Sequence, residues 1–286
     1  MSSAFLRVAR LPGGLALSRI GLETMRLTGP MAWGRPENWD TAIDVLRTAV
    51  EVGVTNIATR HEYGPRVAND LIRIALHPYP ESLVISTTVG LARAPDRSWA
   101  PSLDTDSILR TIYENLALLT VSTLDLVHLC VAGGVPVASP FRVLAGLQQE
   151  RLIAHLGLCC ADPGQIRDAR EIAPVVSVRI PCSAAVVGSE TQVFCAAEGI
   201  VHQLCHPFAR REANQSEVIR ELAAQRGIPA GRLWLAWLLH QHPSALLVVG
   251  TSSVAHLREN AAAVETGLEQ DLVERLADIE QALVRR

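Results

Sequence analysis

Tyr63 closes a short polar segment, Arg60-His61-Glu62, that follows the apolar run 54–58. A phenol can donate a proton to a bound molecule. Its pKa of about 10 nevertheless makes it a weak acid at neutral pH unless a cation stabilises the phenolate. The chain has no lysine to supply that cation, because its 26 residues counted as lysine or arginine are all arginine. The missing amine also excludes Schiff-base chemistry and phosphate binding by a P-loop lysine.

The rest of the chain must bring other functional groups to Tyr63. Apolar, β-branched runs alternate with stretches of helical period along its whole length. The predicted strands are 19–23, 54–58, 83–87, 124–129, 153–159, 175–180, 200–204 and 245–249. The predicted helices are 39–52, 65–77, 104–119, 140–150, 163–171, 190–198, 214–240 and 254–264. Because parallel strands need helical crossovers, this α/β pattern predicts a closed (β/α)8 TIM barrel, with an open doubly wound sheet as the alternative.

We expect one domain, residues 1–286, without a linker that would divide it. Residues 1–18 are predicted to form an N-terminal β-hairpin, which turns at Pro12-Gly13-Gly14. The barrel itself is expected over 19–264, and an extra C-terminal helix over 265–286. Function in such barrels lies at the carboxyl ends of the strands, so the residues that end each predicted strand are the ones to examine.

Several strand ends resemble those of the aldo-keto reductases. GVTNIATRHEYG (53–64) is similar to the second-strand signature of that family, G-x-N-x-x-D-T-A-x-x-Y-G. VISTTVG, LDLVHLC, IAHLGLCC and GTSSVAHLREN follow in the family's order, so that the resemblance covers nearly the whole chain. It implies this barrel fold, NADPH as cofactor, and a tyrosine that protonates the carbonyl oxygen while the nicotinamide delivers a hydride. It also implies an aspartate and a lysine that tune the tyrosine, and a histidine that orients the substrate.

The resemblance carries over only one of those four catalytic residues. Tyr63 matches the tyrosine, but Ala58 stands at the aspartate position, Thr88 at the lysine position and Cys130 at the histidine position. Loss of such a group typically lowers a rate by about 10²–10⁴-fold, although the effects do not add. Ordinary carbonyl reduction is therefore not the expected reaction.

Of the positions that bind the cofactor in the family, those for the nicotinamide end are altered here, whereas those for the phosphate end are largely kept. Where the family holds the nicotinamide carboxamide, this chain has Cys159, Cys160 and Arg179. The segment that would grip the NADP phosphates is better kept, and a helix N-terminus there favours anions. It comprises Gly250, Thr251, Ser252, His256, Glu259 and Asn260. We therefore expect that no cofactor binds, with NADPH as the alternative.

Three further residues are candidates for catalysis together with Tyr63. Glu23 stands where the family's first strand carries glycine, and Arg179 is a new cation at the barrel mouth. We hypothesise that the two share the vacated nicotinamide space, where they pair with each other or with substrate. Glu23 reaching solvent while Arg179 binds a loop carbonyl is the alternative. His128, two residues before Cys130 on the same strand face, is either a displaced acid–base group or a core histidine.

The six cysteines follow no zinc-binding spacing. Cys130, Cys159, Cys160 and Cys205 fall at strand ends near His206, and a thiol nucleophile or metal site there is a minor alternative. Buried packing is the more common role of cysteine, and no metal site is predicted. Charged residues in loops are usually solvated, which is also what we expect of Arg60, His61 and Glu62.

The composition and the absence of long apolar runs limit the classes of binding partner that we expect. The formal net charge of −3 gives no indication of the basic surface that binding to nucleic acid or an anionic membrane would need. The sequence shows neither a membrane-spanning apolar run nor a signal peptide, which predicts a cytoplasmic location. A small molecule is the expected partner, and the oligomeric state is left open.

Three functions fit these observations. The first is a non-redox enzyme that cyclises, isomerises or eliminates within a moderately large apolar substrate, as in secondary metabolism, by proton transfer and positioning at the mouth. The second is an NADPH-dependent carbonyl reductase with a substituted proton donor. The third is a non-catalytic relative that binds a nucleotide or a partner.

Overall fold

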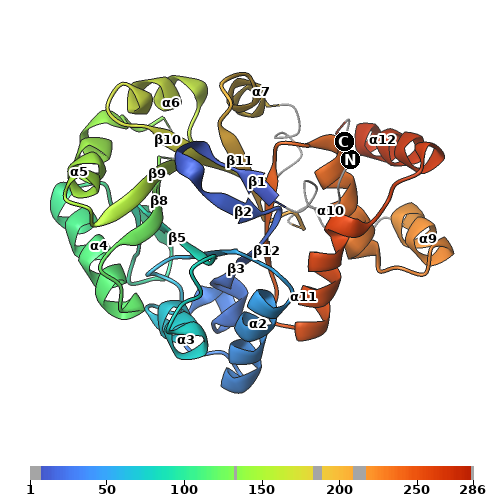
Figure 1. Cartoon of the computed structure of the whole chain (residues 1–286), viewed down its shortest axis with the longest axis horizontal. Helices are drawn as coiled ribbons and strands as arrows, with labels where there is room; N and C mark the ends of the chain where they lie inside the picture. Colours follow the sequence, from blue (N-terminus) through green and yellow to red (C-terminus); the bar gives the residue numbers. More distant parts are fainter. Residues whose placement is uncertain (1–7, 132–133, 183–188, 209–216, 285–286) are drawn as a thin grey trace.

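A closed barrel of eight parallel strands forms the centre of the computed structural model, which describes residues 8–131, 134–182, 189–208 and 217–284 (Figure 1). Strand β12 pairs with β3 and completes the ring. The barrel strands are β3 (Ile20–Glu23), β4 (Asn56–Thr59), β5 (Val84–Val89), β8 (Leu124–Cys130), β9 (Ile153–Cys159), β10 (Val175–Pro181), β11 (Val201–Cys205) and β12 (Leu246–Gly250). The predicted TIM barrel is therefore confirmed, and each predicted strand lies within about two residues of an observed one.

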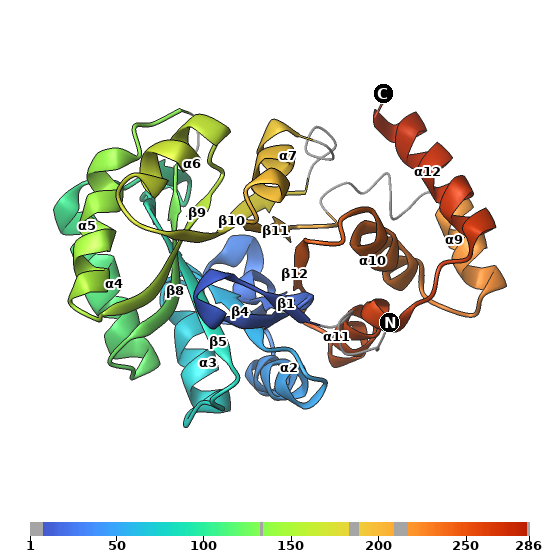
Figure 2. The same ribbon diagram turned by 45° about the horizontal axis from the view of Figure 1, so that its top comes forward.

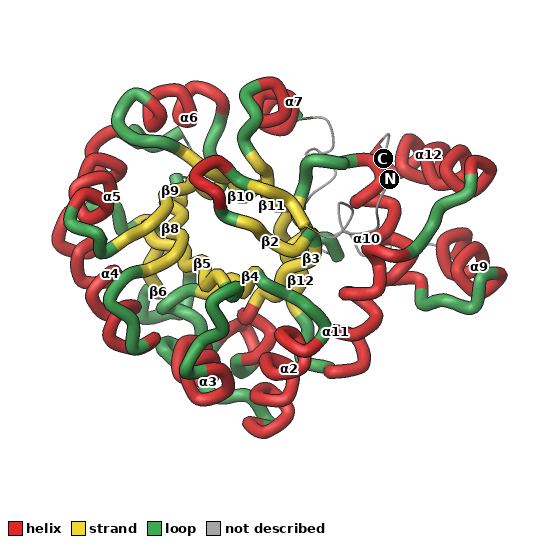
Figure 3. Tube along the Cα trace, viewed as in Figure 1, coloured by secondary structure: helices red, strands yellow, loops and turns green. Residues whose placement is uncertain are grey.

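Helices surround the barrel (Figure 3). They are α2 (Trp39–Glu51), α3 (Val67–Leu76), α4 (Thr105–Leu119), α5 (Ala138–Gln149), α6 (Pro163–Arg170), α7 (Glu190–Ala197), α9 (Glu217–Gln225), α10 (Ala230–Gln241) and α11 (Val254–Ala261). Side-chain caps fix several helix starts: Asp104 accepts from Ser107 N at 2.9 Å, and Asp162 with Gln165 forms a capping box. Among the described helices, none is both long and apolar enough to cross a membrane.

The predicted helix 214–240 is wrong as a single element. The chain forms α9 and α10 instead, because Gly227 adopts a left-handed φ of 64° and Pro229 lacks the amide hydrogen that a helix interior needs. Residues 214–216 of the prediction lie outside the described residues. The predicted C-terminal helix is present as α12 (Gln270–Val284), beside α9 at one side of the barrel (Figure 2).

The N-terminal hairpin closes one end of the barrel. Strands β1 (Val8–Arg10) and β2 (Ala16–Ser18) pair antiparallel across a turn at Pro12–Gly14, and the hairpin lies across the barrel axis in Figure 1. Its buried side chains pack on the first residues of five barrel strands, in the cluster Leu11, Leu17, Val84, Leu126, Val176, Val201 and Leu246. The predicted hairpin is confirmed over residues 8–18, and residues 1–7 lie outside the described part. The apolar plug leaves the carboxyl ends of the strands as the open end.

A second hairpin was not predicted. Strands β6 (Leu91–Arg93) and β7 (Trp99–Pro101) pair antiparallel in the connection from β5 to α4. The turn between them carries a recognisable signal, because Asp96 accepts hydrogen bonds from both the backbone N and the Oγ of Ser98. Three-residue strands are too short to show a periodic pattern, which is why the hairpin was missed.

Above the apolar plug, the barrel interior holds a hydrogen-bonded polar layer. His128 Nε2 lies 2.7 Å from Ser177 Oγ, which in turn accepts from Gln203 Nε2 at 3.3 Å. Gln203 Oε1 accepts from Arg179 Nε at 3.2 Å, so a chain of polar contacts runs from β8 to β11. Burial of these groups is tolerated because most of their polar atoms satisfy one another, although His128 Nδ1 has no hydrogen-bond partner among the described residues.

Gly157 is required by this layer, and Gly157→Ala is expected to destabilise the fold by about 1–3 kcal/mol. A methyl group there would stand 2.5 Å from His128 Cδ2 and 2.7 Å from the backbone oxygen of Ser177. The measurement is chemical denaturation. Gly146→Ala in α5, where a methyl meets nothing within 4 Å, is the control and should be neutral or stabilising. Equal unfolding free energies for both variants would contradict the expectation.

Candidate active site

The open rim of the barrel collects the side chains predicted to act. Because all eight strands are parallel, their last residues meet at this rim. The residues considered are Glu23 from β3, Tyr63 from the loop after β4, Thr88 from β5, Cys130 from β8, Cys159 from β9, Arg179 from β10 and Gly250 from β12. His128, one layer below Cys130 on β8, completes the predicted set.

Tyr63 is held firmly at the rim. Its backbone N donates to Arg60 O at 3.1 Å, and its carbonyl accepts from Ala68 N at 3.1 Å, which fixes the loop that leads into α3. The ring packs edge-on against Trp99 at 6.3 Å and is only 3% exposed. Burial raises the pKa of Tyr63, and the charge of Glu23 adds to this, whereas Arg60 and Arg179 act in the opposite direction. At neutral pH, Tyr63 is therefore a protonated acid.

Arg179 is a buried cation inside the mouth, 2% exposed. Its Nη1 donates to Thr88 Oγ1 at 2.8 Å and its Nη2 to Ser86 Oγ at 3.4 Å, in addition to the Nε bond to Gln203. The guanidinium thus reaches across the barrel from β10 to the residue at the family's lysine position. The sequence located this cation but not its contact with Thr88.

The hypothesised Glu23–Arg179 ion pair does not form. Glu23 is 4% exposed, and its Oε1 has no hydrogen-bond partner. Arg179 binds the polar side chains of β5 and β11 instead. The solvated alternative for Glu23 is equally wrong, because the carboxylate is buried. A buried oxygen without a donor is costly unless a ligand supplies one.

Arg60 also belongs to the mouth, although it was expected to be a solvated loop residue. Its Nη2 lies 3.8 Å from Cys159 Sγ, and its guanidinium carbon lies 5.8 Å from the Trp99 ring centroid. Its Nη1 is buried without a hydrogen-bond partner. Burial acts to lower the pKa of Arg60, but the surrounding Tyr63, cysteines and Glu23 raise it. Nothing in the sequence pattern separated Arg60 from other loop charges.

His128 takes the core role rather than the acid–base role. The ring has no exposed surface and is bonded to Ser177 within the barrel interior. Burial, with smaller contributions from Arg179 and Arg60, lowers the pKa of His128 well below its usual range. A neutral imidazole in the layer beneath the mouth organises the interior and does not meet a substrate at the rim.

Trp33 and Trp99 line the rim together with two arginines. Arg93, on β6, lies 5.5 Å from the Trp33 ring centroid and 4.6 Å from that of Trp99, and Arg97 lies 5.1 Å from Trp33. The second hairpin therefore brings the Trp99 ring and two guanidinium groups to the side of Tyr63. Trp99 remains 40% exposed, although Arg93 and Arg60 lie over its ring.

The segment after β12 begins a helix in the predicted way. Ser253 caps α11 by accepting from His256 N at 3.3 Å, and Thr251 Oγ1 accepts from Ser253 N at 3.1 Å. Thr251 is buried while Ser252 is exposed, and Glu259 pairs with Arg232 at 3.6 Å. Gly250 lies against Arg26, where a methyl group would stand 3.1 Å from Cγ. The helix N-terminus and Arg26 together favour an anion.

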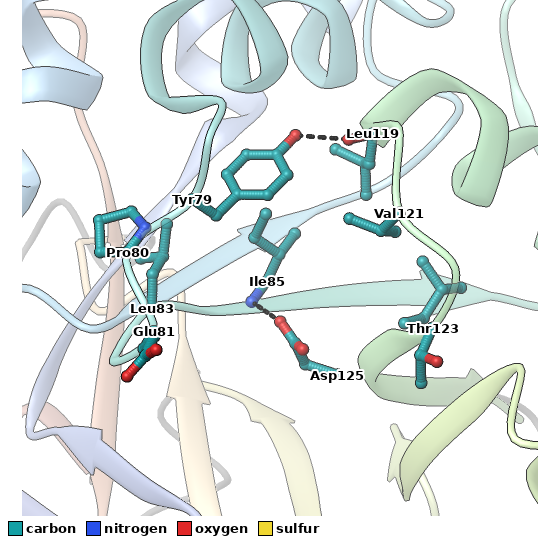
Figure 4. Close-up of a pocket in the computed structure, with 10 residues that line it drawn as sticks. Tyr79, Pro80, Glu81, Leu83, Ile85, Leu119, Val121, Thr123 and Asp125 are labelled. Atoms are coloured by element: carbon teal, nitrogen blue, oxygen red, sulfur yellow. Dashed lines mark hydrogen bonds between the residues drawn. The ribbon is translucent and has the colours of Figure 1, made fainter.

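A small cavity of about 180 Å³ lies away from the rim, near the starts of β5 and β8 (Figure 4). Its lining comes from the first residues of β5 and β8 and from the turn at Tyr79, and so it lies at the plugged end of the barrel. Tyr79 Oη donates to Leu119 O at 2.7 Å, and Asp125 Oδ2 accepts from Ile85 N at 2.8 Å. These polar groups are satisfied within the protein, and the cavity is not part of the candidate site.

Glu62, next to Tyr63, is buried with Oε2 unpaired, and burial raises its pKa to about 7. The unfolded chain ionises near 4.5, so folding stability is lost as pH rises from about 4.5 through 7. Glu62→Gln should therefore stabilise the protein by about 2–3 kcal/mol more at pH 8 than at pH 5. Urea unfolding at both pH values measures this. The exposed Glu221→Gln is the control, and a pH-independent effect of Glu62→Gln would contradict the assignment.

The comparisons with known proteins agree with this geometry. The sequence model described as aldo/keto reductase family matches residues 19–281. This chain belongs to the aldo/keto reductase family. A pyridoxine 4-dehydrogenase of Escherichia coli K12 is 36% identical over 275 residues, which cover 93% of this family member and 96% of the relative.

Solved structures of other aldo/keto reductases share the fold. A glycerol dehydrogenase from Gluconobacter oxydans superposes with a TM-score of 0.87 at 20% identity, covering 100% of this chain and 98% of the other. An aldo/keto reductase from Klebsiella pneumoniae, in complex with NADP and acetate, superposes with a TM-score of 0.79 at 20% identity, covering 96% and 95%.

These findings correct two predictions. The expectation that no cofactor binds is wrong, because the 36% identical relative is a dehydrogenase and a structure of the same fold holds NADP. The expected non-redox reaction finds no support, and the reductase alternative fits the oxidoreductase relatives better.

The mouth residues of this aldo/keto reductase suit a nicotinamide cofactor. A carboxamide carries an NH₂ donor and a carbonyl acceptor. Glu23 Oε1 and Arg60 Nη1 are a buried acceptor and a buried donor without partners, and their charges interact at the same rim. The anion-favouring start of α11, with Arg26 beside Gly250, suits phosphates.

Proposed function

We propose that this protein is a nicotinamide-dependent oxidoreductase that interconverts a carbonyl compound and its alcohol. The observation that carries the proposal is the buried Tyr63 at the mouth, with the charges of Arg60 and Arg179 acting on it. The kinship with a dehydrogenase supports it further. In this proposal the protein keeps the tyrosine that donates the proton in the family. Arg60 and Arg179, which come from other places in the fold, take over the role of the missing lysine.

Tyr63 would act as the general acid in reduction. The cofactor, when bound, supplies or accepts the hydride. The phenol donates its proton to the carbonyl oxygen of the substrate, and the negative charge that develops on Tyr63 Oη is stabilised by the two guanidinium groups. Arg179 is a positioning and electrostatic residue in this scheme, held by Thr88, Ser86 and Gln203.

Glu23 and Arg60 would bind the carboxamide of the nicotinamide through their unpartnered atoms. Of the residues predicted for the phosphate end, Gly250, Thr251, Ser252, His256 and Asn260 would form it together with Arg26. Glu259 pairs with Arg232 instead, which leaves the helix N-terminus and the exposed residues around it as the groups that meet the anion.

Tyr63 is protonated at neutral pH, which is the form that reduction requires. Oxidation of an alcohol requires the phenolate, whose population grows with pH. Its rate should therefore rise about tenfold per pH unit over the range where Tyr63 remains protonated.

The rim suggests a flat, aromatic substrate. The partly exposed Trp99 lies beside Tyr63, and Arg93 and Arg97 add cations that favour anionic or electron-rich groups. An aromatic aldehyde such as pyridoxal combines these properties, in keeping with the pyridoxine 4-dehydrogenase relative.

The test is consumption of NADPH or NADH by the purified protein with pyridoxal, in parallel with methylglyoxal as a small aldehyde without a ring. Turnover with pyridoxal, and a kcat/KM for it at least about tenfold above that for methylglyoxal, is expected. Binding of either cofactor without turnover of any aldehyde would overturn the proposed activity. It would instead favour a nucleotide-binding role.

A further inference from the structure

Three thiols meet at the mouth. The Sγ atoms of Cys130, Cys159 and Cys160 all lie within 4.8 Å of one another, and those of Cys159 and Cys160 are 3.6 Å apart. None of the three forms a disulfide. The group that these described residues form contains no histidine or carboxylate. Neither the reductase chemistry nor cofactor binding as proposed above uses the three sulfurs together.

The backbone explains how consecutive cysteines face one way. Cys130 and Cys159 end neighbouring strands and are paired in register, so their side chains lie side by side. Cys160 would ordinarily point to the opposite face, as successive strand residues do. Its left-handed φ of 59°, with its N donating to Arg179 O at 3.0 Å, turns the chain and brings its Sγ to the other two. The cluster depends on this turn, which the irregular spacing of the cysteines in the sequence does not reveal.

We propose that Cys130, Cys159 and Cys160 form a three-thiolate binding site for a soft divalent cation of the zinc and cadmium class. With metal–sulfur bonds of about 2.3 Å, two thiolates of a tetrahedral zinc site are about 3.8 Å apart. The 3.6 Å separation of Cys159 and Cys160 matches this spacing, and the 4.8 Å limit leaves the third sulfur a small movement away. Thiolates select soft ions over magnesium or calcium.

The charge balance at the cluster fits a divalent ion. Binding breaks three S–H bonds, releases three protons to solvent and forms three metal–sulfur bonds, with no change of oxidation state. Three thiolates and one divalent cation leave one negative charge. Arg60 supplies the compensating positive charge, because its Nη2 is 3.8 Å from Cys159 Sγ.

The cluster is also accessible from one side. Cys130 and Cys159 are buried, whereas Cys160 is only half-buried. An ion can therefore reach the sulfurs past Cys160 while the inner two provide a dry, preorganised floor. With three protein ligands the fourth tetrahedral position stays open to water, as in catalytic rather than structural zinc sites.

The experiment titrates the reduced, full-length protein with Cd²⁺ and follows the ultraviolet thiolate-to-cadmium charge-transfer absorption, then displaces the cadmium with Zn²⁺. One equivalent of cadmium is expected to bind and to be displaced by zinc. Replacing a group that merely supports a metal ligand costs about 10–100-fold in affinity. Loss of a ligand in Cys160→Ser should therefore weaken binding by at least about 100-fold.

Cys195→Ser is the matched control, because Cys195 lies in α7 and is not part of the cluster. It should bind cadmium like the parent protein. Thermal unfolding supplies a second measurement: Zn²⁺ should raise the Tm of the parent protein and of Cys195→Ser, but not that of Cys160→Ser or Cys130→Ala. Absence of the absorption band in the parent protein, or unchanged affinity in Cys160→Ser, would overturn the site. Both measurements are independent of carbonyl reduction, so a failed activity assay does not bear on this result.

Discussion

Tyr63→Phe is expected to lower kcat for carbonyl reduction by about 10²–10⁴-fold, because it removes the only acidic proton that Tyr63 offers to the substrate oxygen. The ring would remain packed against Trp99, and so the shape of the mouth should be preserved. Cofactor affinity should therefore stay within about threefold of the parent value, which separates loss of chemistry from loss of binding. Steady-state kinetics combined with calorimetric titration of NADPH make the distinction.

Tyr113→Phe is the matched control. Tyr113 lies on α4, is 52% exposed, and loses the same hydroxyl without contact to the mouth. Its kinetics should match those of the parent enzyme. If Tyr63→Phe retained more than a tenth of the parent kcat, another group would be the proton donor and the proposed role of Tyr63 would be wrong.

Arg179→Met is expected to have the second largest effect. The substitution removes a buried cation that acts on Tyr63, and it leaves Gln203 Oε1 and Thr88 without their present donor. The phenolate then loses stabilisation, so kcat should fall by about 10²-fold or more. Alcohol oxidation should also be slower at each pH, because the pKa of Tyr63 rises further when the guanidinium is absent and the phenolate becomes scarcer.

Cofactor affinity and rescue by lysine distinguish an electrostatic role of Arg179 from a structural one. A misfolded mouth would weaken NADPH binding as well as lower the rate, whereas loss of the cation alone lowers the rate and leaves the calorimetric NADPH affinity unchanged. Arg179→Lys keeps a positive charge and should restore part of the rate. Arg170→Met serves as the surface control, since Arg170 is an exposed partner of Glu198 and such pairs contribute little. Weakened NADPH binding in Arg179→Met, or no recovery of the rate in Arg179→Lys, would assign Arg179 to architecture alone.

Most of the barrel could be predicted because its elements are periodic. Parallel strands buried on both faces give continuous apolar runs, and the helices between them repeat at three and four residues. The error over 214–240 has a local cause: the left-handed turn at Gly227 and the fixed φ of Pro229 interrupt a segment whose apolar spacing continues on both sides. The spacing of apolar residues shows which side chains are buried, but it does not show where a helix ends.

The candidate site was less predictable than the fold, because long side chains contact residues on strands far from their own. Arg179 could be assigned to β10 from the pattern, but its contact with Thr88 on β5 depends on a guanidinium that spans the barrel. Arg60 looked like an ordinary loop charge and is instead half-buried, with its Nη2 3.8 Å from Cys159 Sγ. The replaced lysine position was visible in the sequence, yet the contacts that Arg179 and Arg60 make at the mouth were not. This led to the expectation, which the oxidoreductase relatives do not support, that hydride chemistry had been lost.

The hairpin β1–β2 has a consequence for how the catalyst is reset after each turnover. Its apolar cluster with the first residues of the barrel strands keeps bulk water away from the lower end of the polar interior. Tyr63 must therefore recover its proton from the rim side, through the same opening by which product departs. Reprotonation of Tyr63 and release of the product therefore use the same opening at the rim.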